Sequence, residues 1–144
     1  MIPKDWTLLV IAAAGGKSVS PVQLQKTLFL LSRNLSAKDL QVDRLYSFEP
    51  YDYGPFDYAV YHDAEKLEAE EQVTIDQAGS RFRSYRATST GLEQASRLRA
   101  KLSPITTGYL DKIVGWVSNL TFNQLIEAIY KAYPEMAKNS VFRR

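Results

Sequence analysis

One histidine and no cysteine leave this chain few side chains that could perform nucleophilic or metal chemistry. His62 is followed by Asp63, Glu65 and Glu68, so a hard cation could in principle meet an imidazole and several carboxylates here. Four-ligand zinc sites draw on histidine and cysteine together, and a catalytic triad needs a nucleophile that no sequence pattern here supplies. A solvated helix face is the simpler explanation. We expect a non-enzymatic protein with no metal and no cofactor.

The residues Gly15-Gly16-Lys17-Ser18 resemble the end of a phosphate-binding loop. Such a loop also needs a glycine four residues before its Gly-Lys-Ser and a strand in front of it, and the chain has neither. An apolar stripe at helical spacing comes before these glycines instead. We therefore expect a turn that ends a helix over residues 3–14.

Five of the nine tyrosines lie between Tyr46 and Tyr61, around a Gly54-Pro55 break. We expect a short extended segment over residues 45–48, a turn in which Gly54 adopts a backbone conformation reserved for glycine, and a helix that starts at about Pro55. Proline at the first helical position costs nothing, because its missing N–H would have no partner there.

The predicted helix after Pro55 is acidic, since residues 55–71 hold six carboxylates and one lysine, a net charge of −5. Its Glu65, Glu68 and Glu71 follow one another at helical spacing, as a solvated face or as an electrostatic docking stripe. We place Tyr46 and Tyr58 inside the protein. The surface expected to bind a partner comprises Tyr51, Tyr53, Tyr61, Glu65, Glu68 and Glu71, because tyrosine is favoured at interfaces.

The remainder of the chain carries a net charge of +7. The candidate nucleic-acid contacts are Arg81, Arg83, Arg86, Arg97, Arg99 and Lys101. Six cations could neutralise several phosphates, which gives affinity without sequence readout. The acidic helix would be repelled from a major groove, so duplex DNA would have to meet the basic residues instead. DNA binding is the alternative function.

The periodicity of apolar residues predicts mostly helices. Ser20 and Pro21 are typical of a helix start, Gln25 and Lys26 lie on the polar side of that helix, and it ends near Asn34. The further elements expected are a polar stretch over 36–43, a β-hairpin with strands over 72–76 and 81–87, and helices over 92–102, 107–117 and 121–132. We predict an α+β chain, mainly α with a small hairpin, in which residues 1–102 form a winged-helix-like core. Residues 103–144 are predicted to be a C-terminal helical extension packed on that core.

Several short motifs resemble a known family. They are LQKTLF at 24–29, YGPF at 53–56, YRATSTG at 85–91 and YPEMAKNS at 133–140. In this order they are similar to motifs of the Panacea, or SocA-like, antitoxin-type domains and their YwgA-like branch. The resemblance implies a prokaryotic or phage protein with a winged-helix-like fold and no established catalysis. It also implies a protein partner in some members, such as a toxin that the domain neutralises.

The leading hypothesis is a protein-binding module whose partner is encoded nearby, in a toxin or phage-defence setting. The longest apolar run, over residues 8–14, is shorter than the roughly 20 residues of a membrane span, and the N-terminus lacks the layout of a signal peptide. We therefore expect a cytoplasmic protein without a membrane partner. The identity of the partner and the oligomeric state are not encoded in any pattern that we recognise.

Overall fold

The computed structural model of this chain describes residues 1–77 and 83–142. Its elements follow one another in the order α1 (Pro3–Ala13), α2 (Pro21–Asn34), α3 (Ala37–Leu40), β1 (Glu49–Tyr51), β2 (Gly54–Phe56), α4 (Tyr58–Ala69), β3 (Val73–Asp76), β4 (Ser84–Ala87), α5 (Ser89–Arg99), α6 (Pro104–Ser118), α7 (Phe122–Ala132) and a 3₁₀-helix η1 (Pro134–Ala137). The described part is mainly helical with two small antiparallel hairpins, so the prediction of a mainly helical α+β chain is confirmed.

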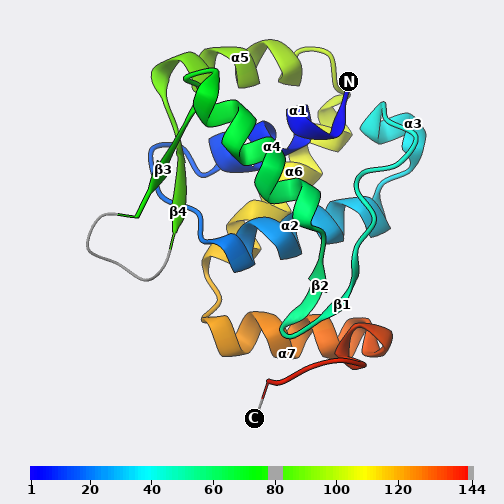
Figure 1. Cartoon of the computed structure of the whole chain (residues 1–144). Coiled ribbons are helices and arrows are strands. Elements are labelled where there is room, and N and C mark those ends of the chain that lie inside the picture. The colour runs from blue at the N-terminus through cyan, green and yellow to red at the C-terminus, as the bar shows by residue number, and fades with distance from the viewer. Residues whose placement is uncertain (78–82, 143–144) are drawn as a thin grey trace.

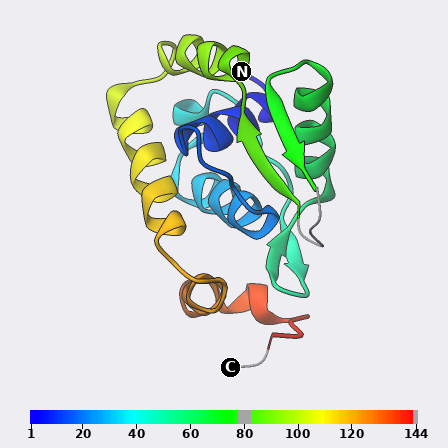
Figure 2. The ribbon, with the colours of Figure 1, turned by 90° about the vertical axis from the view of Figure 1, so that its left-hand side faces the viewer.

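Helix α2 occupies the centre of the molecule, and Figure 2 shows the other helices and both hairpins arranged around it. This helix starts where the sequence predicts, with Pro21 at its first position. The Ser20 hydroxyl oxygen accepts a hydrogen bond from the Gln23 N–H, and the Gln23 side-chain oxygen accepts one from the Ser20 N–H. These contacts satisfy N–H groups that would otherwise lack partners. All eight residues from Leu24 to Leu31 are buried, so α2 has no wide solvent face.

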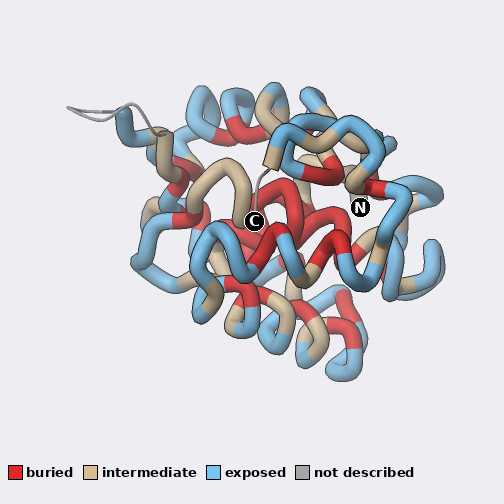
Figure 3. The backbone as a smooth tube through the Cα atoms, turned by 90° about the horizontal axis from the view of Figure 1, so that it is seen from below, coloured by how far each residue is buried: buried red, intermediate tan, exposed pale blue. Residues whose placement is uncertain are grey.

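Two hydrophobic clusters meet along α2. The larger joins α1, α2, α4, α5 and the β3–β4 hairpin, and the smaller joins α2 to α7 and η1. Helix α6 contributes Leu110 and Val114 to the first cluster and Val117 to the second. Residues 103–142 therefore pack on the rest of the chain. Figure 3 shows the buried residues running through the middle of the molecule, with exposed residues around them.

The β3–β4 hairpin lies at one side of the molecule in Figure 1 and pairs Ile75 with Tyr85. Tyr85 also exchanges two backbone hydrogen bonds of 2.8 Å with Val19, in the segment between α1 and α2. The ring of Tyr85 is fully buried. The predicted hairpin with strands over 72–76 and 81–87 is therefore confirmed over residues 73–76 and 84–87. An isolated bridge to Val19, which no sequence pattern predicted, fixes the hairpin to the core.

The segment around Gly54 differs from the expectation. Pro55 does not start a helix: it lies in β2, and α4 begins three residues later, with the Asp57 side chain as its cap. The predicted extended segment over 45–48 is not a strand, and the strands are β1 and β2 instead. Proline fits an edge strand as well as a first helical turn, so local preference alone could not separate the two positions.

Smaller differences concern helix starts. Helix α3 lies in the stretch expected to be polar loop, because Ser36 caps it and Leu40 is buried. Helix α6 begins at Pro104 rather than near 107, since Ser103 caps it. Helix α7 begins at Phe122 with Thr121 as its cap, in agreement with the predicted helix over 121–132. Within residues 1–77 and 83–142, no helix combines the length and the apolar composition needed to span a bilayer.

Gly91 provides a test of how α5 packs. A Cβ atom added there would lie 1.9 Å from the backbone oxygen of Gln72, whereas a Cβ at Gly108 in α6 would meet nothing within 4 Å. We expect Gly91→Ala to lower the free energy of unfolding by about 1–3 kcal/mol through overpacking, despite the better helix propensity of alanine. Gly108→Ala, the matched control, should be neutral or stabilising. Urea denaturation measures both, and equal stability of the two variants would contradict this packing.

Candidate functional site

The residues that the sequence analysis singled out around Gly54 form a β-hairpin, here called the tyrosine hairpin (residues 49–56). Its strands pair Tyr51 with Gly54 across the turn Asp52-Tyr53, and Pro50 with Pro55 one step further. Gly54 has a φ of +94°, so its predicted glycine-only conformation is confirmed. In an antiparallel hairpin, pairs that exchange backbone hydrogen bonds alternate with pairs that do not. Tyr51 and Gly54 flank the turn, so the next pair, Pro50 with Pro55, exchanges none. The two prolines therefore direct their carbonyls to the outer edges of the hairpin.

Helix α2 holds one edge of this hairpin through two side chains. Lys26 Nζ donates to the Pro55 carbonyl oxygen at 3.1 Å. Gln25 makes two hydrogen bonds to the backbone of Asp57, donating to its oxygen at 2.9 Å and accepting from its N–H at 3.0 Å. The predicted placement of Gln25 and Lys26 on the polar side of this helix is wrong: the two side chains are only 1% and 3% exposed.

Burial has an electrostatic consequence at Lys26. Removal from water disfavours the charged ammonium, and this burial lowers the pKa of Lys26 to about 7. Near neutral pH a large fraction of the protein therefore carries Lys26 as a neutral amine. A neutral amine can still donate one hydrogen to the Pro55 carbonyl, so the contact with the hairpin does not require a charge.

The C-terminal segment holds the opposite edge. Asn139 Nδ2 donates to the Pro50 carbonyl oxygen at 3.1 Å, and the Val141 N–H donates to the Asp52 oxygen at 2.9 Å. Helix α7 closes the underside, where a Cβ on Gly54 would lie 3.2 Å from Cε1 of Tyr130. Figure 1 shows the hairpin lying against α7. The tyrosine hairpin is thus supported by α2, by α7 and by the tail.

The hairpin and the start of α4 present a continuous set of rings, here called the aromatic row (Tyr51, Phe56, Tyr58 and Tyr61). Tyr51 stacks on Phe56 with ring centroids 5.0 Å apart, and Phe56 meets Tyr58 and Tyr61 edge-on at 5.8 and 5.4 Å. Tyr51 is 55% and Tyr58 is 63% exposed. Tyr61 is half-buried, and this burial raises its pKa to about 12.

The placement of Tyr58 inside the protein was wrong. With the helix starting at Tyr58 rather than at Pro55, the buried face of α4 carries Val60, Ala64 and Leu67, and Tyr58 points to solvent. The placement of Tyr46 inside was correct. Its hydroxyl lies 2.6 Å from the Thr7 hydroxyl and donates to Asp63 Oδ2 at 2.6 Å. Burial, aided by Asp63, raises the pKa of Tyr46 well above its usual value.

Of the three candidate glutamates, Glu65 and Glu68 have side-chain partners within the protein. Glu65 forms an ion pair of 3.9 Å with Arg83 and stays half exposed. Glu68 accepts from the Ile75 N–H at 3.2 Å, and so covers a donor on the outer edge of β3. Glu71 follows the C-terminal cap of α4 with a φ of +63°, and its backbone oxygen accepts from the Thr88 hydroxyl at 2.7 Å. Its side chain is exposed and forms no ion pair among the described residues.

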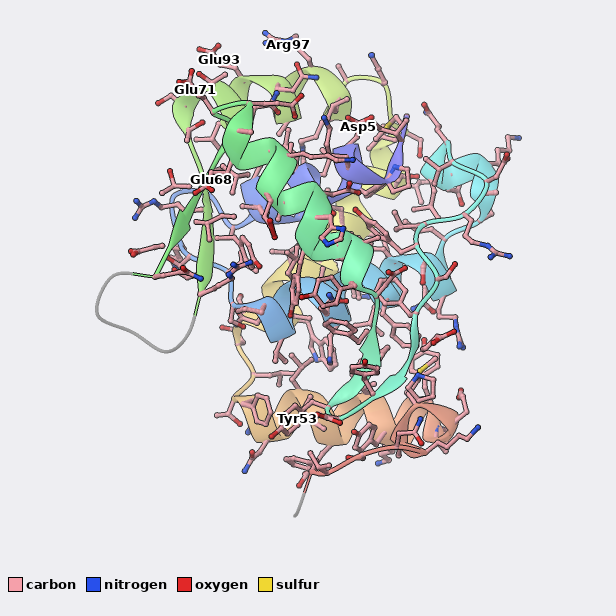
Figure 4. All side chains as sticks on the ribbon, viewed as in Figure 1. Asp5, Tyr53, Glu68, Glu71, Glu93 and Arg97 are labelled. Atoms are coloured by element: carbon pink, nitrogen blue, oxygen red, sulfur yellow. The ribbon has the colours of Figure 1, made fainter. Side chains whose placement is uncertain are left out.

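The structure does not bring all six candidate partner residues into one patch. Figure 4 shows Tyr53 beside α7, whereas Glu68 and Glu71 lie at the other end of α4, near β3. Tyr53 also turns away from the aromatic row and meets Phe122 of α7, with ring centroids 5.2 Å apart. Of the six, Tyr51 and Tyr61 belong to the aromatic row, and Glu65 lies one turn further along α4.

The candidate nucleic-acid residues are also divided. Arg81 lies outside the described residues. Arg83 is paired with Glu65, and Arg99 binds Asp111 through two hydrogen bonds of 3.0 and 2.6 Å. The exposed members without an ion pair in the described part of the chain are Arg86, Arg97 and Lys101. They come from β4, from the outer side of α5 and from the segment after it.

No group of three metal-ligating side chains occurs among the described residues. His62 instead lies against Tyr58, with ring centroids 5.2 Å apart, at the end of the aromatic row. Sequence reasoning missed Lys26, Gln25 and Asn139 as supports of the hairpin. The available signal was that each belongs to one of the motifs quoted for the family resemblance.

The comparisons with known proteins give no relative: the sequence matches no protein-family model, no curated protein and no solved structure. The geometry of this chain is therefore the basis on which its function is proposed.

The turn at Gly54 generates one prediction. Gly54→Val combines a branched side chain at positive φ with a contact of 3.2 Å against Tyr130, and should lower the free energy of unfolding by about 1–3 kcal/mol. Gly16→Val is the matched control, since a Cβ there meets nothing within 4 Å and φ is not positive. Thermal melts followed by circular dichroism compare the two. A melting temperature lowered equally by both variants would contradict the argument.

Lys26 generates a second prediction, on pH. Its pKa is about 7 in the folded protein and near 10.5 in the unfolded chain, so between these values the unfolded state binds more protons. Stability therefore rises with pH above 7, by up to about 1.4 kcal/mol per pH unit. We expect this rise in urea denaturation at pH 7, 8 and 9, and expect Lys26→Met to flatten it. A Lys17→Met control, at an exposed position, should keep the wild-type slope; a slope unchanged in Lys26→Met would refute the assignment.

Proposed function

We propose that this chain is a non-enzymatic protein-binding module whose contact surface is the aromatic row. The observation that carries the proposal is an exposed set of stacked and edge-on rings on a hairpin supported from three sides. Tyrosine offers a large contact area at a small cost in side-chain entropy. A surface that is rigid before binding loses less freedom on association.

The motifs quoted for the Panacea and SocA-like domains support a family proposal. Three of the four meet at the tyrosine hairpin: Lys26 of the first motif binds Pro55 of the second, and Asn139 of the last binds Pro50 beside it. Residues from distant parts of the chain thus form one structural unit. We propose that this unit is why the motifs occur together, and that the chain is an antitoxin-type domain of this kind, YwgA-like branch included.

We further propose a winged-helix-like arrangement for α1, α2, α4 and the β3–β4 hairpin. Two features support it. These elements follow one another in the order α1, bridge residue Val19, α2, α4 and hairpin, with α3 and the β1–β2 hairpin inserted between α2 and α4. Val19 also forms an isolated bridge with Tyr85 beside the β3–β4 hairpin, the wing of this arrangement.

The partner that we propose is a protein encoded next to this one, in the toxin or phage-defence setting that the resemblance implies. Residues 55–71 carry a net charge of −5, and the ion pairs of Arg83 with Glu65 and of Lys4 with Glu70 offset only part of it, so the acidic surface of α4 would steer a partner with a basic surface. The expectation of a cytoplasmic protein stays a prediction.

Duplex DNA remains the second candidate partner. Arg86, Arg97 and Lys101 favour it, because they are exposed and have no carboxylate partner in the described part of the chain. The ion pairs of Arg83 and Arg99 weigh against it, since each would have to break to meet a phosphate. We therefore place protein binding first.

Capture of the co-expressed neighbour-encoded protein tests the proposal. Tyr51→Ala and Tyr58→Ala should each speed dissociation by about tenfold or more, because interface anchors act mainly on the off-rate. Glu65→Gln should instead slow association, and less so at high salt. Trp116→Ala is the matched control: Trp116 is 42% exposed on α6, which lies away from the hairpin in Figure 2.

Surface plasmon resonance gives both rate constants, and circular dichroism must show that each variant stays folded. Wild-type rates in Tyr51→Ala and Tyr58→Ala would reject the aromatic row as the interface. Salt-dependent retardation of duplex DNA that Arg86→Glu and Arg97→Glu abolish would favour the DNA alternative.

A further inference from the structure

A cleft of about 410 Å³ lies on a different part of the molecule, between α1, α2 and α6. This volume is within the range of small-molecule sites. None of the residues of the aromatic row lines the cleft. The two regions are therefore separate candidate sites.

The walls of the cleft combine apolar and small residues. The half-buried Ala13 and Ala14 at the end of α1 supply accessible apolar surface, and the buried Val10 of α1 and Val114 and Val117 of α6 form the wall behind it. Gly115 belongs to the same wall, and a Cβ added there would meet nothing within 4 Å. The space beside Gly115 is therefore open, whereas the space beside Gly54 is filled by Tyr130.

The charges on the lining are those of Lys17 and Asp111. Asp111 is neutralised, because Arg99 binds its carboxylate through hydrogen bonds of 3.0 and 2.6 Å. Lys17 has no ion-pair partner among the described residues. The charge left for a ligand is therefore positive, and an anionic group is its complement.

The local structure fixes the position of Lys17. Gly15 ends α1 with a φ of +68°, which confirms the expected helix-ending turn, and two residues after Lys17 the Val19 backbone pairs with Tyr85. The Gly15-Gly16-Lys17-Ser18 motif is thus anchored on both sides. Gln23 adds a polar group nearby: its Oε1 accepts from the Ser20 N–H, so its amide nitrogen remains a donor for a ligand.

From this geometry we propose that the cleft binds a small organic anion with an apolar body. The anionic group lies against Lys17, and the apolar body lies along Ala13, Ala14 and the α6 wall at Val114 and Gly115. The shared chemistry covers aliphatic and aromatic monocarboxylates. The inference is independent of the protein-binding function, since its test needs no partner protein.

Octanoate and its uncharged analogue 1-octanol are suitable probes. Titration followed by ¹H–¹⁵N NMR should show saturable octanoate shifts at Val114 and Gly115, and weaker binding of octanol. Lys17→Gln should weaken octanoate about tenfold and leave octanol unchanged. Gly115→Leu should fill the free space and weaken both probes. Lys112→Gln, on α6 but outside the lining, is the matched charge control and should bind like wild type.

Three outcomes would overturn the proposal. Shifts that do not saturate, or that neither Lys17→Gln nor Gly115→Leu reduces, would show binding of an adventitious additive only. Equal affinity for octanoate and octanol would remove the role of the anion. An equal loss in Lys112→Gln would reduce the effect of Lys17 to general attraction by the positive net charge, which added salt would also abolish.

Discussion

The structure depends on the hydrogen bonds of two polar side chains that are buried inside the protein. Gln25 and Lys26 lie in the buried stretch of α2, and an unpaired polar group there would cost about as much as a lost hydrogen bond or more. Their partners are the backbone groups of Pro55 and Asp57. The buried side chains of α2 therefore need backbone hydrogen-bond partners. The chain supplies them by returning after β1, so that backbone groups at the end of β2 and the start of α4 face α2. The tyrosine hairpin follows from this requirement.

The same requirement explains why the hairpin suits a binding role. A two-stranded hairpin is marginal by itself, and this one has prolines on both strands. Its stability comes from side chains that reach its outer carbonyls, Lys26 on one edge and Asn139 on the other. The supports leave the rings of Tyr51 and Tyr58 uncovered. The cleft beside Lys17 lies on a different part of the surface, between α1, α2 and α6, so the two sites can be tested separately.

Local signals predicted what depends on local chemistry. Ser20 with Pro21, and Thr121 before α7, define helix starts through caps that involve residues three apart. Gly54 was predicted correctly because positive φ is a property of one residue and its turn. Pro55 and Tyr58 were misplaced together, since proline is compatible with two local structures and the phase of α4 depends on which one forms. The partner surface predicted from composition is divided in space: Glu68 and Glu71 lie at the end of α4 that is far from Tyr53, and the Glu68 carboxylate binds the backbone of β3.

The sequence by itself determined the helices other than α3 and the start of α4, the β3–β4 hairpin, the acidity of α4 and the conformation of Gly54. Capping, periodicity and backbone preference act over a few residues, which is why these features could be predicted. Only the tertiary structure decided that Lys26 is buried and that Asn139 lies against Pro50, 89 residues away in the chain. A buried polar side chain leaves no local pattern: its partners are backbone groups that are near in space and distant in sequence. Those contacts decide which tyrosines face solvent.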